Sequence, residues 1–202
     1  MDLVVAIDVQ MSETCMLADY VLPDTSYLER LEVPEFVGGK VPVVTLRDRV
    51  IEKGDFVLMD YGAGYCDYRS DMTRTVVMAE PTQEQLDLYA LVRRTHEECV
   101  AAIHPGVEGN DIFKLSKKII GDAGYGDYYN HGLGHGVGID IHELPNFNRS
   151  KNIIEVGSVI TMEPGVYLPG VGGVRLEDYG VVTENGYEPF TKTPHDLHVI
   201  DC

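Results

Sequence analysis

The chain begins with hydrophobic runs separated by turn-forming residues. The β-branched run at 3–8, "LVVAID", predicts a buried strand, and residues 11–20 predict a short helix that ends before Pro23. The stretch at 33–44, "VPEFVGGKVPVV", is rich in proline and glycine. This composition predicts a loop or linker between the first strand and the rest of the chain.

From residue 55 the pattern changes to short strands joined by turns. The segments "DFVLMDYG" and "RSDMTRTVVM", separated by "AGYCDY", predict an antiparallel hairpin. The first strand ends at Asp60 and the second carries Asp71. We therefore expect these two carboxylates to face each other.

Two helices and three strands are predicted after the hairpin. Thr82 and Gln85 form a capping box that opens a helix closing at "HPG", residues 104–106. A second helix runs from Asn110 to about Asp122 and ends before a glycine. Its apolar face comprises Ile112, Leu115, Ile119 and Ile120. The predicted strands are "SVITMEPGVYL", "GGVRLEDYG" and "GVVTENGY", the last ending in an Asn-Gly turn.

Composition restricts the classes of function. The 202 residues, 44% of them hydrophobic, fit one globular domain or one domain plus a fragment. A formal charge of −17 disfavours binding to nucleic acid or to anionic membranes. No apolar run approaches the ~18 residues of a membrane span. The four cysteines lack a C-x-x-C pair, which favours free thiols and a cytoplasmic location.

The segment "HGLGHGVGIDIHELP", residues 131–145, interleaves His131, His135 and His142 with four glycines. The glycines disfavour a helix and predict a strand or an extended loop, in which the backbone can approach a ligand closely. A lone histidine is most often a packing residue. Three histidines in such a segment instead indicate a metal site when buried carboxylates are also present.

Four carboxylates lie in apolar or glycine-rich surroundings: Asp60, Asp71, Glu163 and Glu177. Burying four negative charges together is too costly unless cations neutralise them, and four charges indicate two divalent ions. Oxygen-rich ligation with one imidazole favours Mn²⁺ or Co²⁺, with Fe²⁺ and Zn²⁺ as alternatives. Two such ions activate water and polarise a carbonyl, which is the chemistry of a hydrolase.

The motifs over about residues 48–202 resemble, in order and spacing, those of the M24 metallopeptidases, specifically the branch of aminopeptidase P and Xaa-Pro dipeptidase (prolidase). They are "DYGAGYCDYRSDMTRT", "HGLGHGVGIDIHELP", "TMEPGVYL" and "GGVRLEDYGVV". The resemblance implies an α+β pita-bread fold, in which a curved antiparallel sheet carries the metal ligands on its concave face. It also implies a peptide substrate with proline in second position, and methionine aminopeptidase specificity is the nearest alternative.

The resemblance implies a role for each ligand. Asp60 would chelate one ion, and Asp71 would bridge both. His135 and Glu163 would hold the second ion, and Glu177 would be the other bridge.

The remaining site residues would act on the substrate. His131 and His142 would line the substrate pocket, with His142 donating a hydrogen bond to the tetrahedral intermediate. Glu163 would accept a proton, and Arg175 would lie beside the site. One histidine would thus bind metal while two handle substrate.

The first 47 residues depart from the M24 pattern. Residues 1–46 resemble an interior segment of molybdopterin oxidoreductases, without a residue assignable to a molybdenum or iron–sulfur site, and the junction lies near "TLRDRVIEK". The resemblance implies a further half of the fold before the M24 core, which residues 1–46 do not match. We therefore expect a chimera-like chain with impaired substrate positioning, and dimerisation through an open sheet edge. The alternatives are a catalytically silent M24-like metal-binding or interaction protein and a fragment of a molybdenum oxidoreductase.

Overall fold

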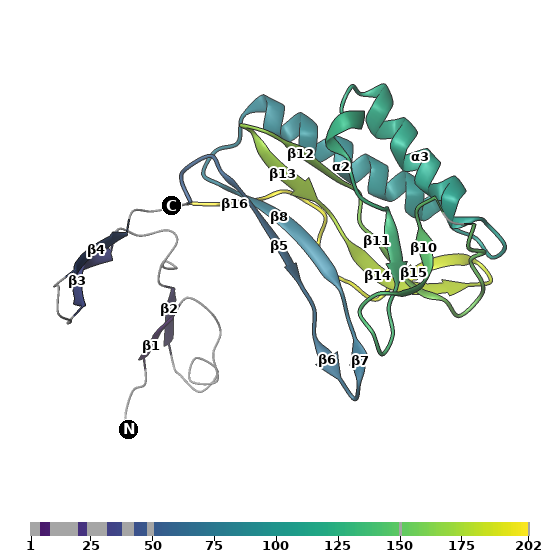
Figure 1. Ribbon diagram of the computed structural model, residues 1–202, viewed down its shortest axis with the longest axis horizontal. Coiled ribbons are helices and arrows are strands. Elements are labelled where there is room, and N and C mark those ends of the chain that lie inside the picture. Colours follow the sequence, from purple (N-terminus) through teal and green to yellow (C-terminus); the bar gives the residue numbers. More distant parts are fainter. Residues whose placement is uncertain are drawn as a thin grey trace. The chain divides into compact units, whose positions relative to one another are not determined.

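The computed structural model describes four backbone strands within residues 5–47 and the ranges 51–149 and 151–201. The chain divides into two compact units, Met1–Glu52 and Lys53–Cys202. Each unit is described by itself below, and the labels follow Figure 1.

The first unit contains two pairs of strands. Strand β1 (Val5–Asp8) pairs in parallel with β2 (Tyr20–Pro23), which confirms the strand predicted at 3–8. Strand β3 (Glu32–Val37) pairs antiparallel with β4 (Val43–Arg47). The loop or linker predicted at 33–44 is therefore wrong at 33–37 and 43–44, where valines favour strands more than the prolines oppose them, and its middle lies outside the described residues. Most of the helix predicted at 11–20 lies outside the described residues.

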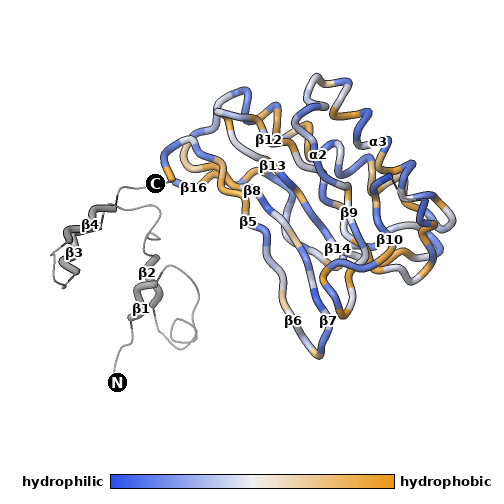
Figure 2. The backbone as a smooth tube through the Cα atoms, viewed as in Figure 1, coloured by the Kyte–Doolittle hydropathy of each residue, from blue (hydrophilic) through white to orange (hydrophobic). Residues whose placement is uncertain are grey.

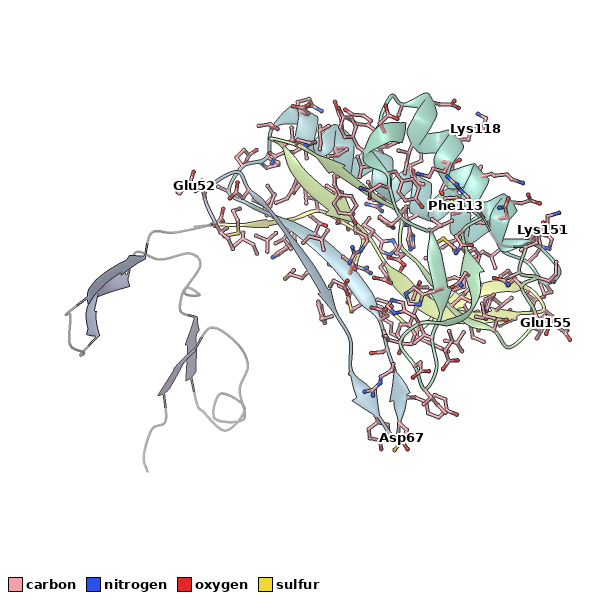
Figure 3. The ribbon with its side chains drawn as sticks, viewed as in Figure 1. Glu52, Asp67, Phe113, Lys118, Lys151 and Glu155 are labelled. Atoms are coloured by element: carbon pink, nitrogen blue, oxygen red, sulfur yellow. The ribbon has the colours of Figure 1, made fainter. Side chains whose placement is uncertain are left out.

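The second unit begins with the predicted hairpin. Strand β5 (Phe56–Tyr61) pairs antiparallel with β8 (Met72–Met78), and Asp60 lies opposite Thr73. The short strands β6 (Gly64–Tyr65) and β7 (Tyr68–Arg69) extend the hairpin to a tip at Asp67 (Figure 3). A last strand, β16 (His198–Ile200), runs parallel to β8 on its other side.

Both predicted helices are present. Helix α2 (Gln83–Ala101) opens on the capping box, because the Thr82 side chain accepts from the Gln85 amide and the Gln85 side chain accepts from the Thr82 amide. Helix α3 (Gly109–Asp122) buries Ile112, Ile119 and Ile120. A single 3₁₀ turn, η1 (Gly126–Tyr128), follows it. Figure 2 shows hydrophilic and hydrophobic residues alternating along α3, as expected of a helix with one packed face.

The remaining strands form two separate sheets. A five-stranded sheet has the order β10-β9-β11-β14-β15, and β12 pairs with β13 in a two-stranded sheet. The bounds are β9 (Gly134–Gly136), β10 (Glu143–Phe147), β11 (Val159–Met162), β12 (Gly165–Leu168), β13 (Gly172–Arg175), β14 (Asp178–Thr183) and β15 (Gly186–Pro189). The turn between β14 and β15 centres on residues 184–185, one position before the predicted Asn-Gly pair.

Two predicted strands are interrupted where their glutamates lie. "SVITMEPGVYL" breaks at Glu163 and Pro164 into β11 and β12, because proline has no amide hydrogen for the ladder. "GGVRLEDYG" breaks opposite, at Leu176 and Glu177, into β13 and β14. The two breaks face each other, since Met162 pairs with Asp178 on one side and the β12–β13 ladder resumes on the other. We call this interruption the strand junction.

The core lies between the two helices and the strands, with α2 and α3 side by side on one face (Figure 1). It consists of two clusters. One includes Cys99, Ile112, Phe147, Ile160 and Met162. The other includes Leu88, Val92, Ile120, Tyr129, Val166 and Leu176.

The α+β class is confirmed, but the strands of the second unit form several sheets, one of them mixed, in place of one antiparallel sheet. No described helix combines the length and apolarity needed to cross a membrane.

Candidate metal centre

The structure gathers the predicted site residues at the strand junction. Glu163 and Glu177 lie in the junction itself, and an isolated bridge joins Glu177 to Thr73 of β8. Asp71 immediately precedes β8, and His135 lies in β9, next to β11. Ligands that are far apart in sequence therefore meet where three sheets approach one another.

The tautomer of His135 is set by its own backbone. Its Nδ1 lies 2.9 Å from the carbonyl oxygen of Gly136, which can only accept, so Nδ1 carries the proton. The lone pair of Nε2 then points toward two carboxylates, with Asp71 Oδ2 and Glu163 Oε1 both 3.6 Å away. Burial lowers the pKa of His135, which keeps the ring neutral. This is the form in which an imidazole binds a metal.

Burial raises the pKa of three of the carboxylates, those of Asp71, Glu163 and Glu177. Glu177 is 2% exposed, and burial raises its pKa well above the usual range for a glutamate. Burial likewise raises the pKa of Glu163, and both burial and the nearby charge of Asp60 raise that of Asp71. Asp60 pairs with Thr73 and not with Asp71, so the prediction that the two carboxylates face each other directly is wrong, although the charge of Asp60 still acts on Asp71. A cation at their centre would restore the ionised forms.

Arg175, in β13, supplies part of that positive charge. Its Nη2 donates to Oδ2 of Asp60, and its Nε lies 3.9 Å from Glu163 Oε2 and 4.0 Å from Glu177 Oε2. Asp60 itself is half exposed, with 50% of its side-chain surface accessible. Arg175 therefore contacts the acidic cluster directly, a closer placement than its predicted position beside the site.

Thr73 connects Arg175 to the most deeply buried glutamate. Its hydroxyl donates to Glu177 Oε2 at 2.6 Å and accepts from Arg175 Nε at 3.0 Å. Thr73 is fully buried. This single hydroxyl therefore fixes the orientation of both charged groups.

A second hydrogen-bonded chain leads from Arg175 to His131. Nδ1 of His131 donates to the carbonyl of Gly132 at 2.7 Å, which leaves Nε2 as an acceptor. The Tyr167 hydroxyl lies 3.1 Å from that Nε2 and 3.0 Å from Arg175 Nη1. Because Arg175 can only donate, Tyr167 accepts from Arg175 and donates to His131.

His142, immediately before β10, is exposed and lies against the cluster. Its ring centroid is 4.4 Å from that of His135, in an edge-on arrangement. His135 thus lies among the carboxylates, His131 is hydrogen bonded to Tyr167, and His142 is exposed to solvent beside His135.

Two glycines of the histidine segment allow close packing of neighbouring strands, whereas the sequence suggested that they let the backbone approach a ligand. A Cβ on Gly134 would lie 2.2 Å from the carbonyl oxygen of Thr161, and one on Gly136 would lie 2.4 Å from that of Leu144. Both obstacles are backbone atoms of the neighbouring strands, β11 and β10. These glycines therefore let β9 fit between its two neighbours, and His135 projects between them toward the carboxylates.

The donor set fits a pair of divalent cations. One group of possible ligand atoms, from Asp71, His135 and Glu177, lies within 4.8 Å, and Glu163 approaches the same imidazole nitrogen. Four carboxylates and one neutral imidazole match the ligands that Mn²⁺, Co²⁺, Fe²⁺ and Zn²⁺ accept.

Sequence reasoning missed Thr73 and Tyr167. A signal for Thr73 exists, since Asp71, Thr73 and Thr75 alternate with larger residues and share one face of the strand. Tyr167 has no comparable signal, because its function depends on contacts with residues from distant segments.

Comparisons with known proteins agree with this geometry. Residues 37–184 match the profile of metallopeptidase family M24. The Xaa-Pro dipeptidase of Pyrococcus furiosus is 44% identical over 151 residues, which are 74% of this chain and 43% of that protein. The chain thus spans less than half the length of the curated relatives it matches.

Solved structures show the same fold. The prolidase of Pyrococcus horikoshii OT3 superposes with a TM-score of 0.72 at 40% identity, over 78% of this chain and 46% of that one. The X-Pro aminopeptidase of Thermotoga maritima gives a TM-score of 0.73 at 35% identity, over 77% of this chain and 44% of that one.

Proposed function

The chain belongs to metallopeptidase family M24, and from this premise we propose that it is a dinuclear-metal peptidase that removes the residue preceding proline from Xaa-Pro peptides or dipeptides. The observation that carries the proposal is the neutral His135 imidazole with its free nitrogen directed at Asp71 and Glu163. The relatives named Xaa-Pro dipeptidase and X-Pro aminopeptidase support the proline-directed specificity.

Within this proposal the ligands divide between two ions. Asp60 would hold the first ion, and His135 and Glu163 would hold the second. Asp71 and Glu177 would be shared by both ions, and a ligand atom of each lies within 4.8 Å of one from His135. Mn²⁺ or Co²⁺ suits this oxygen-rich set best, with Zn²⁺ and Fe²⁺ as alternatives. Two divalent ions supply Lewis acidity there, lowering the pKa of water and polarising a peptide carbonyl.

The chain's own residues orient the reaction. Glu163 would accept the proton that the attacking water releases, because its carboxylate lies beside the free ring nitrogen of His135. His142, at the open side, donates a hydrogen bond to the developing oxyanion. His131 lines the substrate pocket, where the Tyr167 hydroxyl fixes its orientation. Arg175 positions Asp60.

We also propose the sheet curvature, the oligomeric state and the cellular location of the chain. We infer a pita-bread curvature with the ligands on a concave face, and the likeness to the prolidase and X-Pro aminopeptidase structures supports it. A homodimer is supported by β5, which is an edge strand of its sheet among the described strands, because an edge strand can pair with another chain. Two further predictions are retained: a cytoplasmic location, and a separate, molybdopterin oxidoreductase-like origin of residues 1–47.

The test combines bound metal with cleavage. We expect the dinuclear centre to bind two Mn²⁺ ions and the chain to hydrolyse Ala-Pro in preference to Ala-Ala, and we expect Asp71→Asn to abolish both this Mn²⁺ binding and the hydrolysis. Asp111→Asn, which changes an exposed carboxylate paired with Lys114, is the matched control and should change neither. Preferential cleavage of Met-Ala peptides would favour methionine aminopeptidase specificity. Full metal occupancy without cleavage of any peptide would favour the silent metal-binding protein.

A further inference from the structure

A second group of possible metal ligands lies apart from the site described above. It consists of His96 in α2, Asp178 at the start of β14 and His195 in the segment before β16. Oδ2 of Asp178 lies 2.6 Å from Nε2 of His195 and 3.5 Å from Nε2 of His96. The two imidazole rings meet edge-on, with centroids 4.9 Å apart. We call these three residues the His-Asp-His cluster.

His96 is the feature that hydrogen bonding within the protein leaves unexplained. It is 2% exposed, and neither ring nitrogen has a hydrogen-bond partner among the described residues. A buried polar group without a partner is destabilising, and native proteins rarely keep one without a reason. Burial also lowers the pKa of His96 to about 4, so the ring is neutral at physiological pH. A neutral imidazole whose free nitrogen faces a carboxylate is prepared to bind a metal ion.

The two oxygens of Asp178 have different partners, and the one that faces the histidines is hydrogen bonded to His195. Arg74 Nη2 donates to Oδ1 at 2.6 Å, which fixes the carboxylate and directs Oδ2 toward the two histidines. The positive charge of Arg74 disfavours Ca²⁺ and Mg²⁺, which require several oxygen ligands. An ion held largely by neutral nitrogen donors tolerates that charge better.

We propose that the His-Asp-His cluster binds a single Zn²⁺ ion, independently of the dinuclear centre. Nε2 of His96, Oδ2 of Asp178 and Nε2 of His195 supply three ligands, and water completes a four-coordinate site. Ligand atoms about 2.0–2.2 Å from zinc in a tetrahedron are separated by roughly 3.3 Å. The His96–Asp178 distance of 3.5 Å already meets this requirement. The His195–Asp178 hydrogen bond opens as the ion replaces its proton.

The cluster has a route to solvent. The His195 side chain is 25% exposed, whereas those of His96 and Asp178 are 3% and 4% exposed. An ion therefore enters past His195. Once bound, it joins a helix, a central strand and the segment before β16, which are otherwise connected here by hydrogen bonds.

The test separates this ion from the other two. In the full-length chain carrying Asp71→Asn and His135→Gln, the dinuclear centre is disabled, and we expect one Zn²⁺ per chain by elemental analysis and calorimetric titration. Adding His195→Gln should weaken Zn²⁺ binding by about 100-fold or more, since losing even an outer-shell partner costs 10–100-fold. His198→Gln, at an exposed histidine of β16, is the matched control and should leave binding unchanged.

A second measurement does not depend on that background. The unmodified chain should bind three Zn²⁺ ions, and the chain with His195→Gln alone should bind two. If His195→Gln leaves the stoichiometry and affinity unchanged in both backgrounds, the cluster is a hydrogen-bonded network only and the proposal is wrong. If the unmodified chain binds one ion that His195→Gln removes, the dinuclear centre fails while this proposal stands.

Discussion

Replacing Thr73 by valine tests whether the geometry around Glu177 prepares it for metal binding. Valine keeps the shape of the side chain but removes the hydroxyl that donates to Glu177 and accepts from Arg175. A hydrogen bond to a charged group contributes about 1.5–3 kcal/mol. Because ~1.4 kcal/mol is a factor of ten in an equilibrium constant, we expect Thr73→Val to weaken Mn²⁺ binding by roughly 10- to 150-fold.

The assay is calorimetric titration of the metal-free chain with Mn²⁺, accompanied by thermal unfolding of each variant. Thr95→Val is the matched control, because Thr95 is also fully buried but bonds only a carbonyl of its own helix, Leu91. It should lower the unfolding temperature without changing metal affinity. Thr73→Ser retains a hydroxyl and should restore most of the affinity. If Thr73→Val binds Mn²⁺ as tightly as the parent, or if Thr95→Val weakens binding equally, the hydroxyl does not position the carboxylate.

Three further predictions concern the same centre. Removing the ions with a chelator should lower the unfolding temperature. Each ion stabilises the folded chain by about 2.7 kcal/mol when its free concentration is 100 times its Kd. An unchanged melting curve would show that the folded chain has no metal site. His135→Ala should lose an ion, whereas His142→Ala should keep both ions and lower kcat; equal metal loss in both variants, measured by elemental analysis, would contradict the distinction. In the metal-free chain, the raised pKa of Glu177 contributes stability that is lost as the pH rises above its ordinary value of 4.5. The unfolding temperature of Glu177→Gln should therefore increase relative to that of the parent between pH 4.5 and neutrality. A constant difference would show that the pKa of Glu177 is the same in the folded and the unfolded chain.

The sequence predicted the elements whose signals are local. The capping box at Thr82 and Gln85 was found because both halves lie within one turn. The hairpin with Asp60 and Asp71 was predicted for the same reason, since its strands are adjacent in the chain. The carboxylates stood out because ionised groups in apolar surroundings are expensive and need a partner.

Features that depend on tertiary contacts were not predicted. The breaks at Glu163 and Glu177 interrupt apolar runs whose periodicity continues across them, so the pattern indicated longer strands. The function of Gly134 and Gly136 follows from the carbonyls of neighbouring strands, which no single segment specifies. The strands at 32–37 and 43–47 were obscured by the prolines and glycines in that part of the sequence.

The strand junction also makes the centre mechanically sensitive. Glu163 and Glu177 lie where the backbone leaves the five-stranded sheet and enters the β12–β13 ladder. The positions of these two glutamates therefore depend on the orientation of one sheet relative to the other. A small rotation of one sheet against the other would change the distance between the two glutamates while the hydrogen bonds within each sheet stay intact. A displacement of ~1 Å is enough to cost two orders of magnitude in rate where alignment matters. Substitutions in the two hydrophobic clusters, which pack against these sheets, can therefore lower the catalytic rate without changing any metal ligand.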